Sequence, residues 1–426
     1  MKTKILTTGA MFIACLSFGA GFQVLEQGAS NIGSAMAGAT SNASGDASSA
    51  FWNPSAAFFS GIEVGEIKVD AAMNFVIPHF DFDGTASNPL TGGATNMTGN
   101  DGGNAGELAY VPNFYSVYRI SEDFLFSLSI TSPYGLETDY TEGWIGRYHA
   151  LNSELTTIDM NPSIAWKPTE WLSVSAGFAV QWIHAHLTQA TPINPFTGAY
   201  TGADHHMRVS GDGWGFGATL GMAIKYAEGG RLGISWRSKV AHSLSGNACL
   251  DWLSLRGIGA DLTIPQTINA GIYQRLWGPL DRFAVMLDYA WTGWSCFEYL
   301  TIIQDANGQP LGQPVHEDWK NTSRVSLGVH YYPEFDENLV LRCGITWDES
   351  PVKRAEHRTA RIPCADRVWF ACGVGYVWDN ITFDVGYMYI MFPTGGKVEH
   401  STTAGKLSGE FTGHANVVSA QIGIKF

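Results

Sequence analysis

The chain has 426 residues, of which 45% are hydrophobic, 13% aromatic and only 15% charged, and its formal net charge is −14. The many aromatic residues exclude a disordered chain, and the acidic balance excludes nucleic-acid binding, which needs a basic surface for phosphate contacts. Beyond the first 20 residues no run of 18 apolar residues occurs, so a bundle of membrane-spanning helices is excluded as well.

The first residues have the three parts of a secretory signal peptide. Two lysines form a positive start, an apolar stretch too short to span a bilayer follows, and Ser17 and Gly19 provide a small-x-small cleavage pattern. We therefore expect residues 1–19 to be removed and the mature chain to begin at Ala20. A retained buried helix is the alternative.

Cleavage leaves five cysteines, namely Cys249, Cys296, Cys343, Cys364 and Cys372. An odd number cannot all pair within the chain, and the CxxC spacing typical of metal sites does not occur. Disulfide bonds are possible in an exported protein, but they are not the framework of this fold. The spacing leaves their pairing open.

Residues 20–61 do not alternate in the way that strands do. They are rich in Gly, Ala and Ser, and small apolar residues such as Ile32 and Met36 recur at helical spacing. The segment also holds aromatic residues that are costly to leave in water, namely Phe22, Phe51, Trp52, Phe58 and Phe59. We expect short helices packed against a concave surface, which makes the segment a small N-terminal helical hatch that plugs a barrel.

Residues 62–426 show the period-2 alternation of strands. It is clearest over 283–291 and 381–389, where one face is large and apolar and the other is small or polar. The same pattern predicts strands near 64–77, 107–120, 124–136, 153–167, 171–188, 205–226, 231–242, 259–276, 281–294, 321–332, 338–349, 367–378, 381–391 and 412–426. We therefore predict an all-β fold, a 14-stranded antiparallel transmembrane β-barrel with one face toward lipid and the other toward a lumen.

The links between the predicted strands alternate between tight and long. Tight links fall at 121–123, 168–170, 227–230, 277–280, 333–337 and 379–380, and long ones include 78–106, 189–204, 295–320 and 392–411. Outer-membrane barrels have short periplasmic turns and longer outside loops. The pattern predicts a multi-pass protein of the Gram-negative outer membrane with both termini in the periplasm. The chain also ends within a strand on the aromatic Phe426, as such barrels commonly do.

The third predicted strand is interrupted. Its clean alternation stops at Ser132-Pro133-Tyr134-Gly135; Pro133 cannot donate to a strand ladder, and Gly135 tolerates unusual backbone angles. We expect the strand to bend inward there and to leave neighbouring backbone groups unpaired, which at membrane depth is tolerated only beside a cavity or under protein. The alternative is that the strand ends at Thr131 and a loop begins.

Few residues carry chemistry. His184 and His186 share one strand face, with His205 and His206 across a loop; a metal would need a convergent third ligand, so we expect polar lumen or loop residues and no metal. The alternate glycines of 211–217 lack the GxGxxG spacing of a dinucleotide loop and are expected to leave one strand face bare. Since no nucleophile motif occurs, we expect neither enzymatic activity nor a cofactor.

A basic cluster falls in the predicted outside loop before the strand at 367–378. Its members are Lys353, Arg354, His357, Arg358 and Arg361. We expect it to contact lipopolysaccharide phosphates or acidic neighbours rather than a substrate.

Several segments together resemble the FadL/TodX family of outer-membrane transporters of hydrophobic compounds. They are Ala20-Gly21-Phe22-Gln23, Asn53-Pro54-Ser55 (where the family usually has Asn-Pro-Ala), and residues 129–140, 146–168, 211–221, 230–240, 264–271, 287–300 and 344–352. The resemblance implies a 14-stranded barrel with an N-terminal hatch. It also implies passive uptake: capture between outer loops, transfer to an apolar pocket, movement of the hatch, and sideways exit through the wall.

The resemblance also assigns roles to residues. It implies that Phe22 lies in or beside the ligand pocket, that Asn53 and Pro54 close the hatch, and that Pro133, Tyr134 and Gly135 flank a lateral opening at the kinked third strand.

The ligand that the resemblance implies is a long-chain fatty acid, whose carboxylate the family meets with basic side chains. Where those positions align, around Gln189 and Val315, this chain has no charge. Neutral aromatic or aliphatic hydrocarbons are therefore the alternative ligands, and Arg147, Lys320 and Arg324 are the other candidates to meet a carboxylate. A general porin is less favoured because of the hatch. We expect a monomer whose other partners are outer-membrane lipid and lipopolysaccharide.

Overall fold

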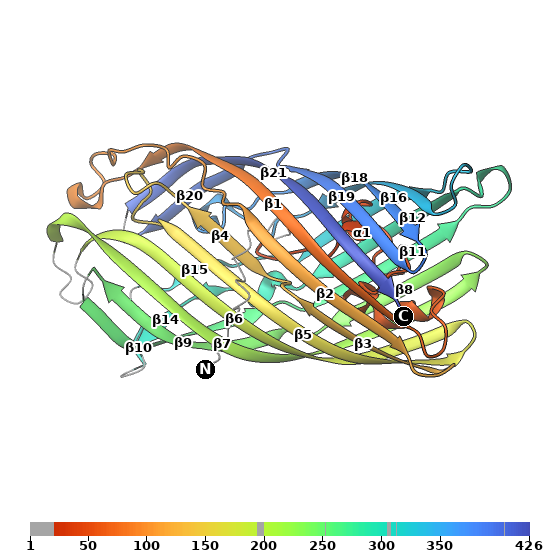
Figure 1. Ribbon diagram of the computed structural model, residues 1–426. Helices are drawn as coiled ribbons and strands as arrows, with labels where there is room; N and C mark the ends of the chain where they lie inside the picture. Colours follow the sequence, from red (N-terminus) through yellow and green to blue (C-terminus); the bar gives the residue numbers. More distant parts are fainter. Residues whose placement is uncertain (1–20, 194–199, 252, 305–307, 312, 404) are drawn as a thin grey trace, which may run out of the picture.

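The computed structural model describes residues 21–426 except 194–199, 252, 305–307, 312 and 404. The predicted signal peptide, residues 1–19, therefore lies outside the described residues. The described chain forms a closed antiparallel barrel of 14 strands, strongly tilted against its long axis (Figure 1). Among the described residues, no helix has the length and apolar character needed to cross a membrane.

The wall consists of continuous and of interrupted strands. The continuous ones are β1 (Ile67–Ala86), β2 (Ala109–Arg119), β5 (Asn152–Thr169), β6 (Leu172–Ile193), β7 (Tyr200–Ala227), β12 (Phe283–Thr292), β16 (Thr322–Tyr331), β17 (Leu339–Asp348), β18 (Arg367–Trp378) and β21 (Gly405–Lys425). The interrupted ones are β3 (Phe124–Thr131) with β4 (Gly135–Asp139), β8 (Gly230–Arg237) with β9 (Val240–Leu250), β10 (Leu253–Ile264) with β11 (Thr267–Arg275), and β19 (Ile381–Met391) with β20 (Gly396–Thr402). Each wall strand pairs with its neighbour in sequence, and β21 pairs with β1 to close the barrel.

The connections hold only short elements. They are η2 (Pro89–Thr91), η3 (Gly278–Leu280), η4 (Trp294–Cys296), η5 (Ala355–His357), the small pair β13 (Tyr299–Leu300) and β15 (Val315–His316), and β14 (Ile302–Gln304), which pairs with β10. Tight turns gather at one end of the barrel, where the C-terminus lies, and we call it the turn end (Figure 1). The opposite end is called the loop end.

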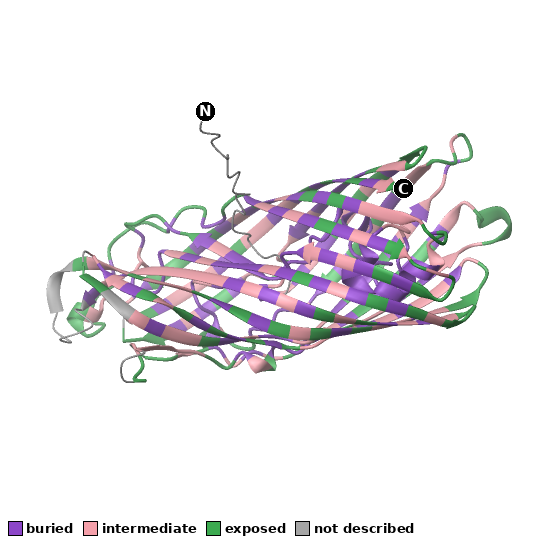
Figure 2. Ribbon diagram, turned by 60° about the horizontal axis from the view of Figure 1, so that its bottom comes forward, coloured by how far each residue is buried: buried purple, intermediate pink, exposed green. Residues whose placement is uncertain are grey.

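Side chains alternate between the two faces of the wall, as predicted. In β12, Val285, Leu287 and Tyr289 are exposed on the outside, whereas Met286 and Asp288 between them are buried in the lumen. Figure 2 shows the resulting bands of exposed and buried residues along the strands. The alternation confirms an apolar outer surface, whereas the lumen side combines polar residues such as Asp288 with apolar ones such as Met286.

The prediction of long links at 78–106, 189–204 and 392–411 is wrong in part, because β1, β6, β7, β20 and β21 continue into them. In β1, Phe80 and Phe82 still face inward and are buried, but Asp81 between them is polar. The apolar signal of the outer face therefore ends before the hydrogen-bonded strand does.

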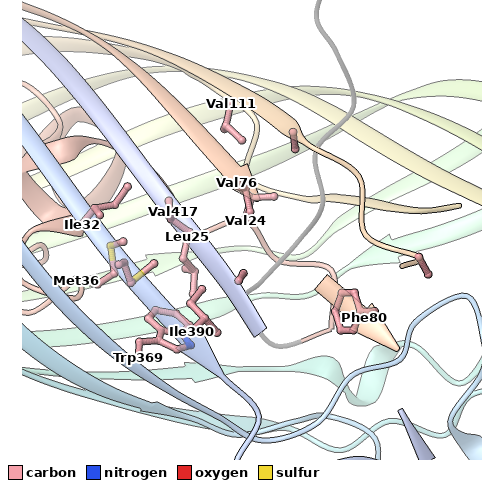
Figure 3. Close-up of a cluster of buried hydrophobic side chains, with 14 of the residues drawn as sticks. Val24, Leu25, Ile32, Met36, Val76, Phe80, Val111, Trp369, Ile390 and Val417 are labelled. Atoms are coloured by element: carbon pink, nitrogen blue, oxygen red, sulfur yellow. The ribbon is translucent and has the colours of Figure 1, made fainter. Parts of the chain in front are cut away.

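Residues 21–62 lie inside the barrel, and we call them the lumenal segment. They include α1 (Ala29–Ile32), α2 (Ser49–Trp52) and η1 (Pro54–Phe59), and almost all of their side chains are buried. Figure 3 shows Val24, Leu25, Ile32 and Met36 of the segment packed with the wall residues Val76, Val111, Trp369, Ile390 and Val417. Burial of these apolar groups stabilises the segment in the lumen.

Polar contacts also attach the lumenal segment to the wall. The Asp288 carboxylate accepts hydrogen bonds from the backbone N–H groups of Gly38 (2.5 Å) and Thr40 (3.1 Å), and Thr346 donates to the Ala35 carbonyl (2.6 Å). Such bonds satisfy backbone groups of the irregular stretch between α1 and α2. The segment is thus held at many points along its length.

Candidate functional site

Two adjoining pockets occupy the lumen between the lumenal segment and the loop end. The inner one, with a volume of about 90 Å³, is lined mainly by apolar side chains of the wall and of the β12–β16 connection. They include Leu136, Leu155, Leu187, Val209, Leu244, Ile258, Leu262, Phe297 and Leu300. This pocket can hold an apolar ligand group and offers few hydrogen-bond partners to a polar one.

The outer pocket is larger, about 710 Å³, and more polar. It is lined by residues of the loop end, including Tyr148, His149, Gln189, Val315, His316, His357, Glu399 and His400. Leu187, Val209, Leu300 and Ile302 belong to the linings of both pockets. The two pockets therefore adjoin, with the polar one nearer the loops.

Arg361 lies where the two pockets meet, and it lines both. Its Nη2 donates to the Gln189 Oε1 (2.7 Å), and its Nη1 donates to the Ser153 hydroxyl (3.0 Å) and the Thr188 carbonyl (3.2 Å). These bonds hold the loop that follows β17 against the wall at the loop end of the barrel. The Nε–H and one Nη2–H of Arg361 have no acceptor among the described residues.

Glu317 lines both pockets as well and is buried. It accepts a hydrogen bond from the Trp319 indole N–H (3.0 Å). Burial raises the pKa of Glu317 to about 8, with the Arg361 charge opposing the shift, and burial lowers the pKa of Arg361 to about 10. At neutral pH the boundary between the pockets therefore holds a cationic Arg361 beside a largely protonated carboxyl.

Phe22 closes the inner pocket on the side of the lumenal segment. Its ring lies 4.7 Å from the ring of Trp294, 5.6 Å from Phe297 and 5.7 Å from Trp319, measured between ring centres. Tyr134 of the wall stands 6.1 Å away on the same cluster. The sequence-predicted residues Phe22 and Tyr134 thus come together beside the pocket.

The wall is incompletely paired next to this cluster. β3 pairs with β2 as far as the partners Phe114 and Ile130, but β4, which resumes at Gly135, pairs with β5 alone among the described strands. On the same side, residues 109–113 of β2 pair only with β1. We call this break in the strand pairing between β2 and β4 the interval. The next backbone contact across it is a hydrogen bond from the Asp139 N–H to the Ala105 carbonyl (3.0 Å).

The first residues of the lumenal segment stand behind this interval. The Val24 N–H donates to the Pro133 carbonyl (2.8 Å), and the Gly135 N–H donates to the Phe22 carbonyl (2.9 Å). On the other side, Asn113 of β2 donates to the Glu26 carbonyl (3.0 Å). Residues 22–26 therefore lie between the two separated strands on the lumen side.

The structure differs from the alternative for the third strand and agrees in part with the expected bend. The strand does not stop at Thr131, since β4 continues it along β5. Neighbouring residues 109–113 of β2 have no partner strand on that side among the described strands, as expected, whereas the backbone groups of 133–135 bond to the lumenal segment and to the Thr157 hydroxyl. Thr157 accepts from the Tyr134 N–H (3.0 Å) and donates to its carbonyl (2.6 Å).

Asn53 and Pro54 lie away from the pockets, at the far part of the lumenal segment. The Asn53 amide donates to the carbonyls of Thr40 (3.1 Å) and Met222 in β7 (3.0 Å), and its oxygen accepts from the Ser55 hydroxyl (2.6 Å). Pro54 begins η1, where its missing N–H is no loss. Asn53 and Pro54 thus help to join two parts of the lumenal segment to each other and to the wall. They line neither of the two pockets described above.

The three cations proposed to meet a carboxylate are engaged elsewhere. Arg147 pairs with Asp204 (2.7 Å), Lys320 pairs with Glu349 (2.6 Å), and Arg324 is buried against the rings of Trp52 and Trp369. None of the three lines either of the two pockets. The cation at the pockets is Arg361, which the sequence placed in the outside basic cluster. That cluster of five basic residues was the only sequence signal for it.

The rest of the basic cluster matches the expectation of acidic neighbours in part. Lys353 and Arg354 approach Asp318 at 3.1 and 3.7 Å, whereas Arg358 donates to backbone carbonyls, including that of Cys364 (2.8 Å).

The other candidate residues are the histidines of β6 and β7 and the alternate glycines of β7. Within the described ranges, no group of three or more His, Cys, Asp or Glu side chains is placed to hold a metal ion. The alternate glycines of β7 abut β9, and Gly211 also lines the inner pocket. The glycines that let the lumenal segment approach the wall are others, chiefly Gly233, Gly344 and Gly386.

Comparison with known proteins identifies a family with similar sequences and solved structures with a similar fold. A model of the family described as outer membrane protein transport protein (OMPP1/FadL/TodX) matches residues 10–426. The long-chain fatty acid transport protein of Escherichia coli O6:H1 is 27% identical over 420 residues, which cover 90% of each chain. Outer membrane protein P1 of Haemophilus influenzae is 26% identical, over 91% of this chain and 89% of that protein.

Solved structures share the architecture. The crystal structure of a Pseudomonas aeruginosa FadL homologue is similar with a TM-score of 0.85 at 24% identity, covering 95% of this chain and 99% of that one. The Ralstonia pickettii toluene transporter TbuX is similar with a TM-score of 0.66 at 17% identity, covering 93% and 98%. At such identities the likeness establishes the fold alone.

Proposed function

Because the chain belongs to the OMPP1/FadL/TodX family of outer-membrane transport proteins, which are not enzymes, we propose that it carries long-chain fatty acids passively across the outer membrane. The observation that supports this ligand is Arg361, a cation with two free N–H groups at the boundary of an apolar pocket. A fatty acid has the matching chemistry, since its carboxylate suits a guanidinium and the end of its chain suits the apolar inner pocket.

In this proposal the loop end faces the cell exterior and the turn end faces the periplasm. A fatty acid first enters the outer pocket, whose polar lining tolerates water. The end of its chain then moves into the inner pocket, where burial of apolar surface contributes about 25 cal/mol per Å². The carboxylate stays at Arg361, where it also meets the protonated Glu317.

The lumenal segment acts as the hatch in this mechanism. Phe22 separates the inner pocket from the interval between β2 and β4, so a shift of residues 22–26 opens a path sideways into the bilayer. Pro133, Tyr134 and Gly135 flank that path. Lateral exit suits an apolar solute, because it never has to cross water on the periplasmic side. Asn53 and Pro54 hold the remainder of the segment to β7 while its first residues move.

The route needs no energy input, because the solute moves from a dilute outer solution to a bilayer that dissolves it. The exposed apolar band of the wall makes membrane lipid its surrounding partner. The exposed Lys353 and Arg354 are suited to lipopolysaccharide phosphates, and in this proposal the barrel functions as a monomer.

A neutral hydrocarbon is the second candidate ligand, and the almost wholly apolar lining of the inner pocket favours it. The two ligands place different demands on Arg361, which a hydrocarbon does not use. A general porin is disfavoured, because the lumenal segment lies across the path that a water-filled pore would need.

Uptake by cells tests the proposal. A strain that lacks its own fatty-acid transporter should take up a radiolabelled long-chain fatty acid when it expresses this protein, and the purified protein should give no steady ion current in planar bilayers. Uptake of toluene but not of the acid would favour the neutral ligand, and a steady current without uptake would contradict transport by this route.

A further inference from the structure

We propose that Cys343 and Cys372 form a disulfide bond across β17 and β18 on the outer face of the barrel. The five cysteines of residues 21–426 allow many pairings, but the strand register brings these two directly opposite one another. The proposal rests on the proposed function only in that export takes the chain through an oxidising compartment.

The position of the pair within the ladder is suited to such a bond. The Val377 N–H donates to the Asn338 carbonyl (3.0 Å), and these two residues are opposite one another one step beyond the partners Leu339 and Tyr376. In an antiparallel ladder hydrogen-bonded and non-hydrogen-bonded pairs alternate. Counting five steps from Val377, the pair of Cys372 and Cys343 is a non-hydrogen-bonded one.

Non-hydrogen-bonded pairs bring side chains closest together. Their Cα atoms lie about 4.5 Å apart, which falls within the range of about 4.4–6.8 Å that a disulfide accepts. Both thiols also point the same way, because both residues are exposed on the outer face. A bond between the two sulfur atoms therefore needs only small adjustments of the side chains.

The other cysteines have different surroundings. Cys249 lies near the Ser254 hydroxyl, Cys296 near the Thr263 carbonyl, and Cys364 accepts from the Ser350 hydroxyl (3.2 Å). These positions lie on different strands and loops. The odd number of cysteines thus resolves into one cross-strand pair and three thiols.

The oxidation is a thiol–disulfide exchange with a periplasmic protein disulfide. The thiolate of one cysteine attacks that disulfide to give a mixed disulfide, and the second thiolate displaces the reduced carrier. Two electrons pass to the carrier, and the two thiol protons are released to its thiols or to water. Since lipid disfavours thiolates, the exchange takes place before the strands enter the membrane.

The bond would reinforce the wall where the lumenal segment rests on it. Gly344 and Gly373 follow the two cysteines and face inward, and a Cβ on either would collide with Ser34 or Gly33. Because these two glycines have no side chains, the cohesion of β17 and β18 at this point depends on backbone hydrogen bonds and on contacts at the outer face. A disulfide at that point holds β17 to β18 while the hatch moves.

Peptide mapping tests the proposal. The protein is expressed through the periplasm, alkylated with iodoacetamide during lysis, denatured and digested with trypsin. We expect peptide 343–353 linked to peptide 368–397, each of which holds a single cysteine, and loss of this species on reduction. As a matched control, Cys364→Ser should leave the linked species unchanged, whereas Cys343→Ser should leave Cys372 alkylated without prior reduction.

Two results would overturn the proposal. One is recovery of both peptides in alkylated form without reduction, and the other is a link from either cysteine to a different one. Neither result bears on fatty-acid uptake, which the transport assay measures separately.

Discussion

Arg361→Met tests whether a carboxylate is bound at the boundary between the two pockets. Arg361 offers two free N–H groups there, and a hydrogen bond to a charged group contributes about 1.5–3 kcal/mol. Loss of that contribution should weaken binding of a long-chain fatty acid roughly 10- to 150-fold. Isothermal titration calorimetry of the detergent-purified protein, with the acid below its micelle concentration, measures the change.

Two controls separate this charge effect from a disturbed loop. The methyl ester of the same acid has no carboxylate, so its affinity should change by less than about twofold. Lys353→Met removes a charge from the same loop, at a residue paired with Asp318 (3.1 Å) and outside both pockets. It should leave the affinity for the acid unchanged. Equal losses for the acid and the ester would refute the reasoning, because Arg361 would then act only by holding the loop through Gln189; so would an unchanged affinity for the acid.

Three further predictions concern the pocket, the wall and pH. Phe22→Ala should weaken fatty-acid binding about tenfold, since about 1.4 kcal/mol of apolar contact is lost, while the heat-resistant gel mobility of the barrel stays unchanged; undiminished binding would place the pocket elsewhere. The double variant Pro133→Val and Gly135→Thr should restore strand pairing and abolish uptake with unchanged binding in calorimetry, and normal uptake through a closed wall would rule out lateral exit. Because the carboxyl of Glu317 is neutral below its pKa of about 8 and anionic above it, fatty-acid affinity should fall as pH rises through 8; Glu317→Gln should remove this dependence, and an identical pH profile in the variant would contradict it.

The sequence predicted the barrel well, because lipid and lumen impose opposite demands on successive residues of every strand. In the stretch from Phe283 to Trp291 the alternation fixes both the strand and its outward face. The same reasoning underestimated β1, β7 and β21. Beyond the bilayer both faces of a strand contact water or polar groups, so the hydrogen-bonded ladder continues without an apolar signal.

The sequence also located the interruption at Pro133, because a missing N–H is a local property of the residue. It could not show that Val24 and Phe22 supply the partners of Pro133 and Gly135. Those contacts join segments more than 100 positions apart, and nothing in either segment encodes the other's register.

Arg361 shows most clearly what the sequence alone could not predict. As one of five basic residues in a predicted outside loop it is expected at the cell surface, whereas in the folded chain its bonds to Ser153, Thr188 and Gln189 turn it into the lumen. Strand periodicity follows from whether each residue contacts lipid or the lumen, so it can be read directly from the sequence. The direction of a loop side chain depends on acceptors that only the closed barrel brings within reach, so the tertiary structure alone decided where the cation lies.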